Sequence, residues 1–336
     1  MADVILIGAG RMGHRFSQAI RQSGNTLLAI FDPGEKPFAV EAEPELASFH
    51  IRDFQEVLDS SAEVFVICTT AEHHVSIASE LIRSGKKRLV IEKPLSQSLA
   101  DAEVLQALTD EFNARVVVNH GRRYCENTAL LKSLDGADKT GSLRSISITM
   151  GGGALGCVGT HWIDLCNNLM GSLPEKVFCE LSAYTPGNNR GAKFFDPGGT
   201  ACLFYAGGRR AILNMGDDVG IVAGADFVYE TGLVTWAVES GKWVFRHRSE
   251  ENREKSLALY GIPLEESAVE TKAPDLIAYG ISALDDVLSD APIQSGLMQA
   301  RDTMEVFCAM RNSAEDESVV RLPLDEAAKQ VVYSIP

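Results

Sequence analysis

The stretch from Val4 to Gly13, VILIGAGRMG, limits the possible folds more than any other part of the chain. Its apolar, largely β-branched start is typical of a buried strand, and it leads directly into a glycine-rich turn. At this spacing Gly8 makes the turn, Gly10 lets a pyrophosphate approach the backbone, and Gly13 lets the following helix pack closely on the strand. A phosphate would then meet the unpaired N–H groups of the first helical turn, which contains Arg11 and Met12. The pattern therefore predicts a dinucleotide-binding turn.

The residues that follow complete a β-α-β unit. A second strand, Thr26 to Phe31, leads to Asp32, about 20 residues after the glycine turn. A carboxylate at this position accepts hydrogen bonds from the ribose hydroxyls of NAD and repels the 2′-phosphate of NADP. The sequence therefore favours NAD, and the nearby Lys36 leaves NADP as the alternative. The apolar face of the intervening helix is formed by Met12, Phe16, Ala19 and Ile20.

Length, charge and composition limit the partners. At 336 residues the chain is long enough for two domains, and its formal net charge of -15 argues against binding nucleic acid or an anionic membrane surface. Residues 1–30 lack the pattern of a signal peptide and no apolar run reaches about 18 residues, so we expect a cytoplasmic protein. The cysteines form no CxxC pair and the histidines lack metal-ligand spacing, so we expect neither a disulfide framework nor a metal site.

Strands and helices alternate as far as residue 120. Strand-like runs at 63–69, 88–91 and 115–119 are separated by amphipathic helices, which predicts a Rossmann domain over residues 1–120. Its sheet would be doubly wound and parallel, with right-handed crossovers. One of these helices should begin near Ser98. Its predicted buried face consists of Val104, Leu105, Leu108 and Phe112.

The pattern changes from residue 121 onward. Short strand-like runs follow one another with hairpin-like links, and two helical stripes follow, at 277–288 and 297–307. Residues 121–336 therefore predict an α+β domain with a large, mostly antiparallel sheet, whose C-terminal segment can pack back on the first domain. The predicted strands are 145–150, 176–184, 200–205, 210–215, 225–230, 233–238 and 243–246.

Candidate site residues follow the predicted strands, because open α/β sheets bind ligands beyond the carboxyl ends of their strands. Lys93 stands at a strand end, and the following Pro94 disfavours the α region for it. Further along, closely spaced glycines lead into a helix on which His161 and Asp164, three residues apart, share a face.

At these motifs the sequence resembles the Gfo/Idh/MocA family, named after glucose-fructose oxidoreductase, inositol dehydrogenase and a rhizopine-catabolism protein. The resemblance covers essentially the whole chain. It implies an NAD(P)-dependent dehydrogenase or reductase that acts on the CH–OH groups of sugars, cyclitols or nucleotide sugars and forms a homodimer or homotetramer. The motifs are GAGRMG at 8–13, TTAEHH at 69–74, EKP at 92–94, RRY at 122–124, GTHWID at 159–164 and the closing segment 312–324.

The resemblance also implies roles for individual residues. The glycines would hold the pyrophosphate and Asp32 the ribose, Lys93 would touch cofactor and substrate, and His161 would act as acid or base. An imidazole suits this role because a hydroxyl must lose its proton as hydride leaves its carbon, and Lys93 supplies a cation where the oxygen becomes negative. The nicotinamide side would be lined by Thr69, Thr70, His74 and Glu92.

Two departures from the family pattern affect the catalytic details. The family usually has Asp four residues before the histidine, where this chain has Cys157, and usually has Asn where this chain has Ala71. A thiol is a weak hydrogen-bonding group and would orient a sugar hydroxyl less well than a carboxylate. Asp164 could compensate by holding His161 in one tautomer, although the resemblance more often implies a structural partner of this helix at that position.

Several alternatives stay open at this point. Arg122, Arg123 and Tyr124 could bind an anionic substrate group or tie the two domains together, with Arg123 and Tyr124 as the candidate substrate contacts. The polar loop 184–199 could cover the substrate or simply connect two strands. For the protein as a whole, the alternatives are redox-neutral use of NAD by a sugar lyase or hydrolase, and a non-catalytic dinucleotide-binding regulator.

Overall fold

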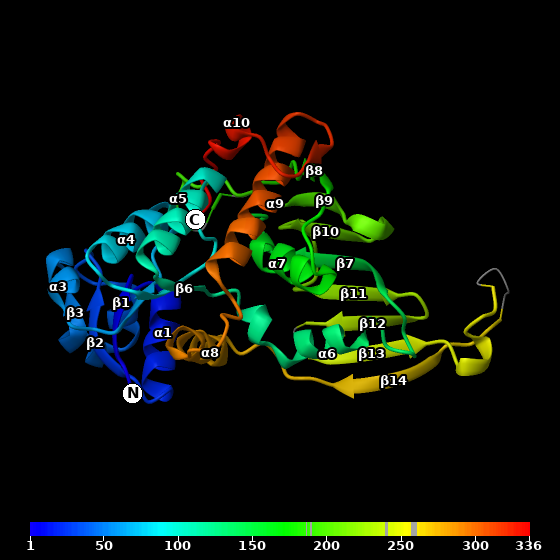
Figure 1. Cartoon of the computed structure of the whole chain (residues 1–336), viewed down its shortest axis with the longest axis horizontal. Helices are drawn as coiled ribbons and strands as arrows, with labels where there is room; N and C mark the ends of the chain where they lie inside the picture. Colours follow the sequence, from blue (N-terminus) through cyan, green and yellow to red (C-terminus); the bar gives the residue numbers. More distant parts are fainter. Residues whose placement is uncertain (186, 189, 239–240, 257–260) are drawn as a thin grey trace.

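A computed structural model of the chain describes residues 1–185, 187–188, 190–238, 241–256 and 261–336. Within residues 1–120, a six-stranded parallel sheet has the strand order β3-β2-β1-β4-β5-β6, which is the doubly wound arrangement that the sequence predicts (Figure 1). Its strands are β1 (Asp3–Ile7), β2 (Thr26–Phe31), β3 (His50–Ile51), β4 (Val64–Ile67), β5 (Arg88–Ile91) and β6 (Arg115–Val118).

Helices cover both faces of this sheet. Side chains alternate along a strand, so Val4 and Leu6 pack in one apolar cluster with Phe16 of α1, while Ile5 and Ile7 pack in another. Burying Phe16 fully stabilises the domain by about 1.5–3 kcal/mol. The helical segments are α1 (Arg11–Gln22), α2 (Phe38–Ala42), η1 (Pro44–Phe49), α3 (Phe54–Asp59), α4 (Ala71–Arg83) and α5 (Leu99–Phe112).

One detail of α5 differs from the prediction. Ser98 caps the helix by accepting a hydrogen bond from the Asp101 N–H, and Leu105 and Leu108 are buried as expected. Val104, however, is 53% exposed, because the buried stripe runs through Leu99, Ala102 and Leu105 and leaves Val104 beside it.

The second sheet has nine strands within the described residues, in the order β14-β13-β12-β11-β7-β10-β9-β8-β15. All its pairs are antiparallel except β7 with β10, so the prediction of a mostly antiparallel sheet is confirmed. The strands are β7 (Leu143–Gly151), β8 (Lys176–Leu181), β9 (Gly199–Phe204), β10 (Arg210–Gly216), β11 (Gly224–Tyr229), β12 (Gly232–Ala237), β13 (Lys242–His247), β14 (Glu265–Glu270) and β15 (Val320–Arg321).

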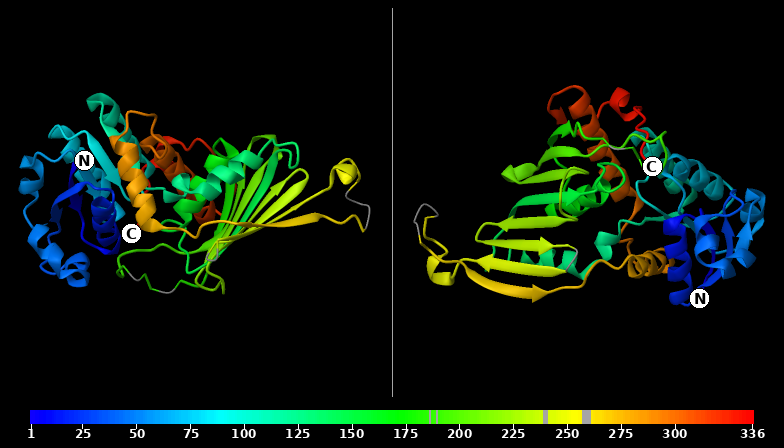
Figure 2. Two further views of the ribbon diagram at one scale, coloured as in Figure 1. Left: turned by 90° about the horizontal axis from the view of Figure 1, so that it is seen from below. Right: turned by 180° about the vertical axis from the view of Figure 1, so that it is seen from behind.

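Helices α6, α7 and α9 lie on one face of this sheet, between it and the first sheet (Figures 1 and 2). On the opposite face Phe178, Cys202 and Ile212 stand in register across three strands, and Phe178 and Ile212 are 39% and 37% exposed. The remaining helical segments are η2 (Gly121–Tyr124), α6 (Glu126–Leu134), α7 (Gly159–Met170), η3 (Ala206–Gly208), η4 (Glu250–Asn252), α8 (Leu276–Leu288), α9 (Leu297–Glu315) and α10 (Glu326–Lys329).

The chain returns to the first sheet after β14. Helix α8 packs against α1, where Gly280 faces Ala19 and Phe16, and Ser295 donates a hydrogen bond to the carbonyl of Val118 at the end of β6. The segment that follows the second sheet's outer strand is therefore part of the wall of the first domain.

Candidate functional site

A cavity of about 1060 Å³ lies between the two sheets. One wall comes from the ends of β1, β2, β4 and β5, and the other from the segments after β7, β8 and β10. Ten of the predicted site residues line it, namely Gly8, Gly10, Arg11, Met12, Asp32, Thr69, Thr70, Glu92, Lys93 and Cys157.

The glycine turn has the geometry that a dinucleotide needs. Gly8 adopts a φ of +94°, and a Cβ on Gly13 would lie 2.1 Å from the carbonyl oxygen of Gly8, so neither position tolerates a side chain. A Cβ on Gly10 would meet nothing within 4 Å. The turn is thus closed where helix and strand pack and open where a pyrophosphate would approach.

Asp32 lies at the same edge of the sheet. Its Oδ2 accepts a hydrogen bond from the Ala9 N–H at 2.9 Å, and its Oδ1 accepts one from the Gly34 N–H at 2.9 Å. The carboxylate is therefore fixed beside the glycine turn and keeps lone pairs for a further donor, so these residues fit the adenosine half of NAD.

Lys93 joins the two walls of the cavity. Its ammonium donates a hydrogen bond to the carbonyl oxygen of Cys157 at 2.7 Å, and the Cys157 thiol lies 3.7 Å away. The neighbouring Glu92 is 4% exposed and accepts a hydrogen bond from the Asn119 side chain at 2.7 Å. Burial raises the pKa of Glu92, and the charge of Lys93 opposes that shift.

His74 is buried behind the cavity wall. Its Nδ1 lies 2.9 Å from the carbonyl oxygen of Pro94 and its Nε2 lies 3.1 Å from that of Thr69. The ring thereby links the segment after β4 to the segment after β5, and burial lowers its pKa to about 4. Its contacts suit a positioning role for Thr69 rather than direct contact with a ligand.

His161 lies four residues after Cys157, near the start of α7. Its Nδ1 is buried and has no hydrogen-bond partner among the described residues, and its ring meets that of His120 edge-on, with centroids 6.1 Å apart. Burial, the charge of Lys93 and the neighbouring His120 and Arg122 together hold the pKa of His161 well below its usual value. The imidazole is therefore neutral at neutral pH.

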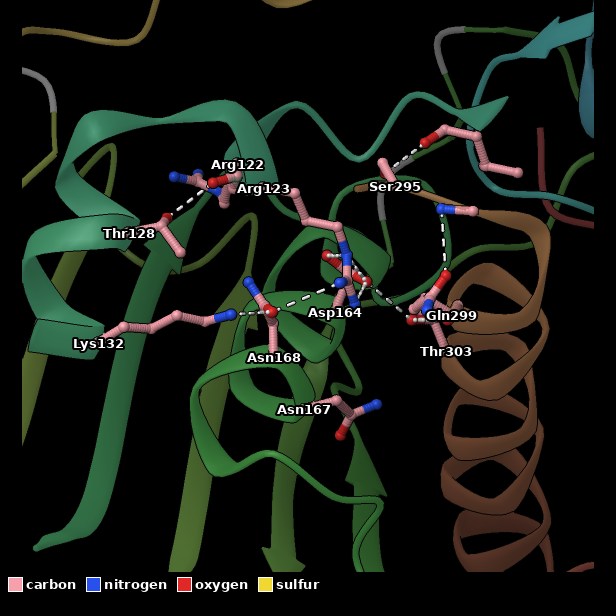
Figure 3. Close-up of polar contacts among 12 residues, drawn as sticks. Arg122, Arg123, Thr128, Lys132, Asp164, Asn167, Asn168, Ser295, Gln299 and Thr303 are labelled. Atoms are coloured by element: carbon pink, nitrogen blue, oxygen red, sulfur yellow. Dashed lines mark hydrogen bonds and ion pairs between the residues drawn. The ribbon is translucent and has the colours of Figure 1, made fainter. Parts of the chain in front are cut away.

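The contacts of Asp164 differ from its predicted role as the partner of His161. The Asp164 carboxylate is fully buried and binds the Arg123 guanidinium, whose Nε lies 2.9 Å from both carboxylate oxygens (Figure 3). Thr303 of α9 donates to the same carboxylate at 3.4 Å. The reason is that α7 turns Asp164 away from the cavity, toward η2 and α9.

Arg122, Arg123 and Tyr124 also make contacts within the fold. The Arg122 guanidinium lies 3.6 Å from the centroid of the Trp162 ring, Arg123 is engaged by Asp164, and the Tyr124 hydroxyl donates to Asp286 of α8 at 2.9 Å. These contacts favour the second of the two alternatives for this segment, in which it ties the domains together.

The sequence reasoning missed Asp196, which lies in the loop between β8 and β9 and lines the cavity. Its carboxylate accepts hydrogen bonds from the N–H groups of Gly156 and Cys157, both at 2.7 Å. The signal available in the sequence was the Asp-Pro-Gly run at 196–198, within a loop already singled out as polar. Residues 186 and 189 of that loop lie outside the described residues.

Within the described part of the chain, no helix combines the length and apolar content needed to cross a membrane. Nor does that part of the chain gather three or more His, Cys, Asp or Glu side chains into a metal-binding group.

Comparison with solved structures supports the fold. Levoglucosan dehydrogenase in complex with NADH has a TM-score of 0.80 at 18% identity, over 96% of this chain and 100% of its own. GenD2 from gentamicin A biosynthesis, in complex with NAD, has a TM-score of 0.76 at 19% identity, over 96% and 97%. An oxidoreductase from Agrobacterium radiobacter, in complex with NAD+, L-tartaric acid and magnesium, has a TM-score of 0.77 at 14% identity, over 95% and 98%. No curated protein sequence gives a significant match.

Two family models match successive parts of the chain. Residues 2–120 match the oxidoreductase family with an NAD-binding Rossmann fold, and residues 135–221 match the Gfo/Idh/MocA C-terminal domain. The predicted fold, the predicted family and the prediction of an NAD-binding Rossmann domain are thereby confirmed. The chain belongs to the Gfo/Idh/MocA family of oxidoreductases.

Proposed function

We propose that this protein is an NAD-dependent oxidoreductase that transfers hydride between nicotinamide and a hydroxyl-bearing carbon of a sugar, cyclitol or nucleotide sugar. The observation that carries the proposal is the position of Lys93, whose ammonium binds the backbone of Cys157 at the cavity that the glycine turn also lines. A cation donor, a neutral imidazole and a dinucleotide cradle are the groups that this chemistry needs.

Nicotinamide, when bound, would supply the hydride chemistry, and the chain would supply the proton chemistry. Lys93 has donor capacity beyond its bond to Cys157 and would bind the substrate oxygen, which becomes negative as its carbon is oxidised. His161, neutral at neutral pH, would take the hydroxyl proton and return it in the reverse direction. Asp164 and Arg123 would act at a distance, by fixing α7.

NAD is favoured over NADP by Asp32, whose carboxylate is fixed beside the glycine turn. A 2′-phosphate would place a second negative charge next to it. The substrate class of hydroxyl-bearing compounds is supported by the similar structures in complex with levoglucosan and with L-tartaric acid. A cytoplasmic location and a homodimer or homotetramer remain parts of the proposal. The apolar side chains on the outer face of the second sheet are consistent with such an assembly.

The first test is a turnover screen. Purified protein with NAD or NADP is offered free sugars, cyclitols, sugar acids and nucleotide sugars, and reduced nicotinamide is followed by absorbance. We expect reduction of NAD with at least one polyol. Confirmed cofactor binding without any turnover would contradict the proposal and favour redox-neutral chemistry or a regulatory role.

Variants then test the two proposed catalytic groups. Lys93→Met and His161→Ala should each lower turnover by at least about 100-fold while NAD affinity stays within a few-fold, because each removes a group that acts on the reacting oxygen or its proton. The matched controls are Lys132→Met and His247→Ala, whose native side chains contact Asn168 and Glu265 away from the cavity. A near-normal rate in either site variant would exclude that residue from the mechanism.

A further inference from the structure

Asp196 is a cavity-lining carboxylate that the proposed reaction leaves without a role. It comes from the loop between β8 and β9, far in sequence from the other site residues, yet both of its oxygens are fixed. Oδ1 accepts the Gly156 N–H and Oδ2 accepts the Cys157 N–H, each at 2.7 Å. A Cβ on Gly156 would lie 2.9 Å from Oδ1, so this approach also depends on a glycine.

Asp196 and Lys93 hold the same residue from its two sides. Asp196 binds the N–H of Cys157, and Lys93 binds its carbonyl oxygen at 2.7 Å. An ionised carboxylate has about four lone-pair sites and an ammonium has three protons, so each group keeps hydrogen-bonding capacity after these contacts. The cavity therefore presents a fixed acceptor and a fixed donor, with opposite charges, beside one residue, Cys157.

We propose that Asp196 is a substrate-positioning residue that accepts a hydrogen bond from a hydroxyl adjacent to the one that reacts. Lys93 would bind the reacting oxygen, and Asp196 would orient its neighbour. Because an ionised carboxylate only accepts hydrogen bonds and an ammonium only donates them, this pair selects compounds with adjacent hydroxyls. The inference rests on the proposed function for the identity of the reacting oxygen.

Binding to the NADH-loaded protein tests Asp196 without requiring turnover. The probes are D-glucose, myo-inositol, levoglucosan and their monodeoxy analogues, with dissociation constants measured by calorimetry. For the best-bound parent, we expect the wild type to lose about tenfold or more in affinity when one particular hydroxyl is removed. In Asp196→Asn the parent should bind about tenfold more weakly, and that deoxy analogue should bind within about twofold of the parent.

The decisive readout is the loss of the affinity difference between the parent compound and its deoxy analogue. A loop that had merely shifted would weaken the binding of both compounds alike. The matched control is Asp135→Asn, whose native carboxylate accepts the Leu143 N–H at 2.7 Å away from the cavity. Asp135→Asn should keep the wild-type difference in affinity between the parent compound and the deoxy analogue. If Asp196→Asn does not fold, Asp196→Glu replaces it, because this variant keeps the charge and should weaken the parent while retaining part of the deoxy penalty.

The outcomes separate the two proposals. A full deoxy penalty in Asp196→Asn, or a wild type that binds none of the three parents, overturns the role of Asp196. A wild type that binds a parent with the expected penalty but turns over no polyol supports Asp196 and contradicts the oxidoreductase proposal instead.

Discussion

At the scale of single residues, the surroundings of a side chain decide what it can do. His161 shows this most clearly, since its ring is placed among Lys93, His120 and Arg122, and each of these neighbours disfavours a further positive charge. The proton-accepting form of His161 is consequently the resting form near neutral pH.

This predicts the pH dependence of the reaction. The folded-state pKa of His161 lies below its ordinary value near 6.5, so the base form persists to lower pH than for a free imidazole. In the oxidative direction, kcat/KM should be insensitive to His161 between about pH 6.5 and 8 and should fall only at more acidic pH. A pH–rate profile of kcat/KM tests this pH dependence. A half-maximal rate at or above pH 6.5 on the acid limb would contradict the prediction.

The sequence predicted the site residues whose positions follow from the strand they terminate. It did not predict the residues whose positions depend on partners far away in the sequence. Gly8, Asp32 and Lys93 lie at the ends of strands whose pattern is clear, and the structure places all three on the cavity. Asp164 pairs with Arg123, 41 positions earlier, which no local pattern reveals. Asp196 reaches the cavity because of a loop path that spacing alone does not define.

At the scale of elements, the spacing of apolar residues along the chain predicted most of the strands and helices. The predicted strands with strong apolar alternation all occur, some with ends shifted by a few residues. The sequence pattern did not indicate β3, β14 or β15. β14, EESAVE, is a polar edge strand without a continuous apolar face, and β3 and β15 have only two residues each. All three are defined by their pairing partners rather than by their own sequences.

The glycine turn gives a matched pair of predictions within one element. Gly10→Ala should fold like the wild type, because its Cβ meets only open space, but should weaken NAD binding by at least about tenfold by blocking the pyrophosphate. Gly13→Ala should also lower stability, because its Cβ would lie 2.1 Å from a backbone oxygen. Calorimetric NAD affinity and urea unfolding separate the two effects. Unchanged NAD binding in Gly10→Ala would place the pyrophosphate elsewhere.

At the scale of the whole molecule, buried polar contacts join the two sheets. Arg123, on the segment after β6, binds Asp164 on α7, and their side chains are 10% and 0% exposed (Figure 3). Tyr124 binds Asp286 of α8, so the same short segment also contacts the returning helix. These contacts fix the relative position of the walls on which a ligand between them would depend.

Breaking the ion pair should therefore be costly. Asp164→Asn leaves the Arg123 charge buried and unpaired, and we expect a loss of about 3–5 kcal/mol in the free energy of unfolding. The control is Glu266→Gln, which removes an exposed partner of Arg246 and should change stability by no more than about 1 kcal/mol. Urea unfolding followed by circular dichroism measures both. Similar losses in the two variants would show that the buried Arg123–Asp164 pair stabilises the fold no more than an exposed pair does.

The cavity wall divides along the chain. Residues 8–93 form the side with the glycine turn, and residues 152–217 form nearly all of the side that follows β7, β8 and β10. Substitutions can therefore accumulate in the second set with little effect on the first, except where Lys93 meets Cys157 and where Lys193 pairs with Glu72. A lineage of such proteins can in this way exchange one substrate for another while keeping its coenzyme, and a laboratory library confined to 152–217 would explore the same freedom.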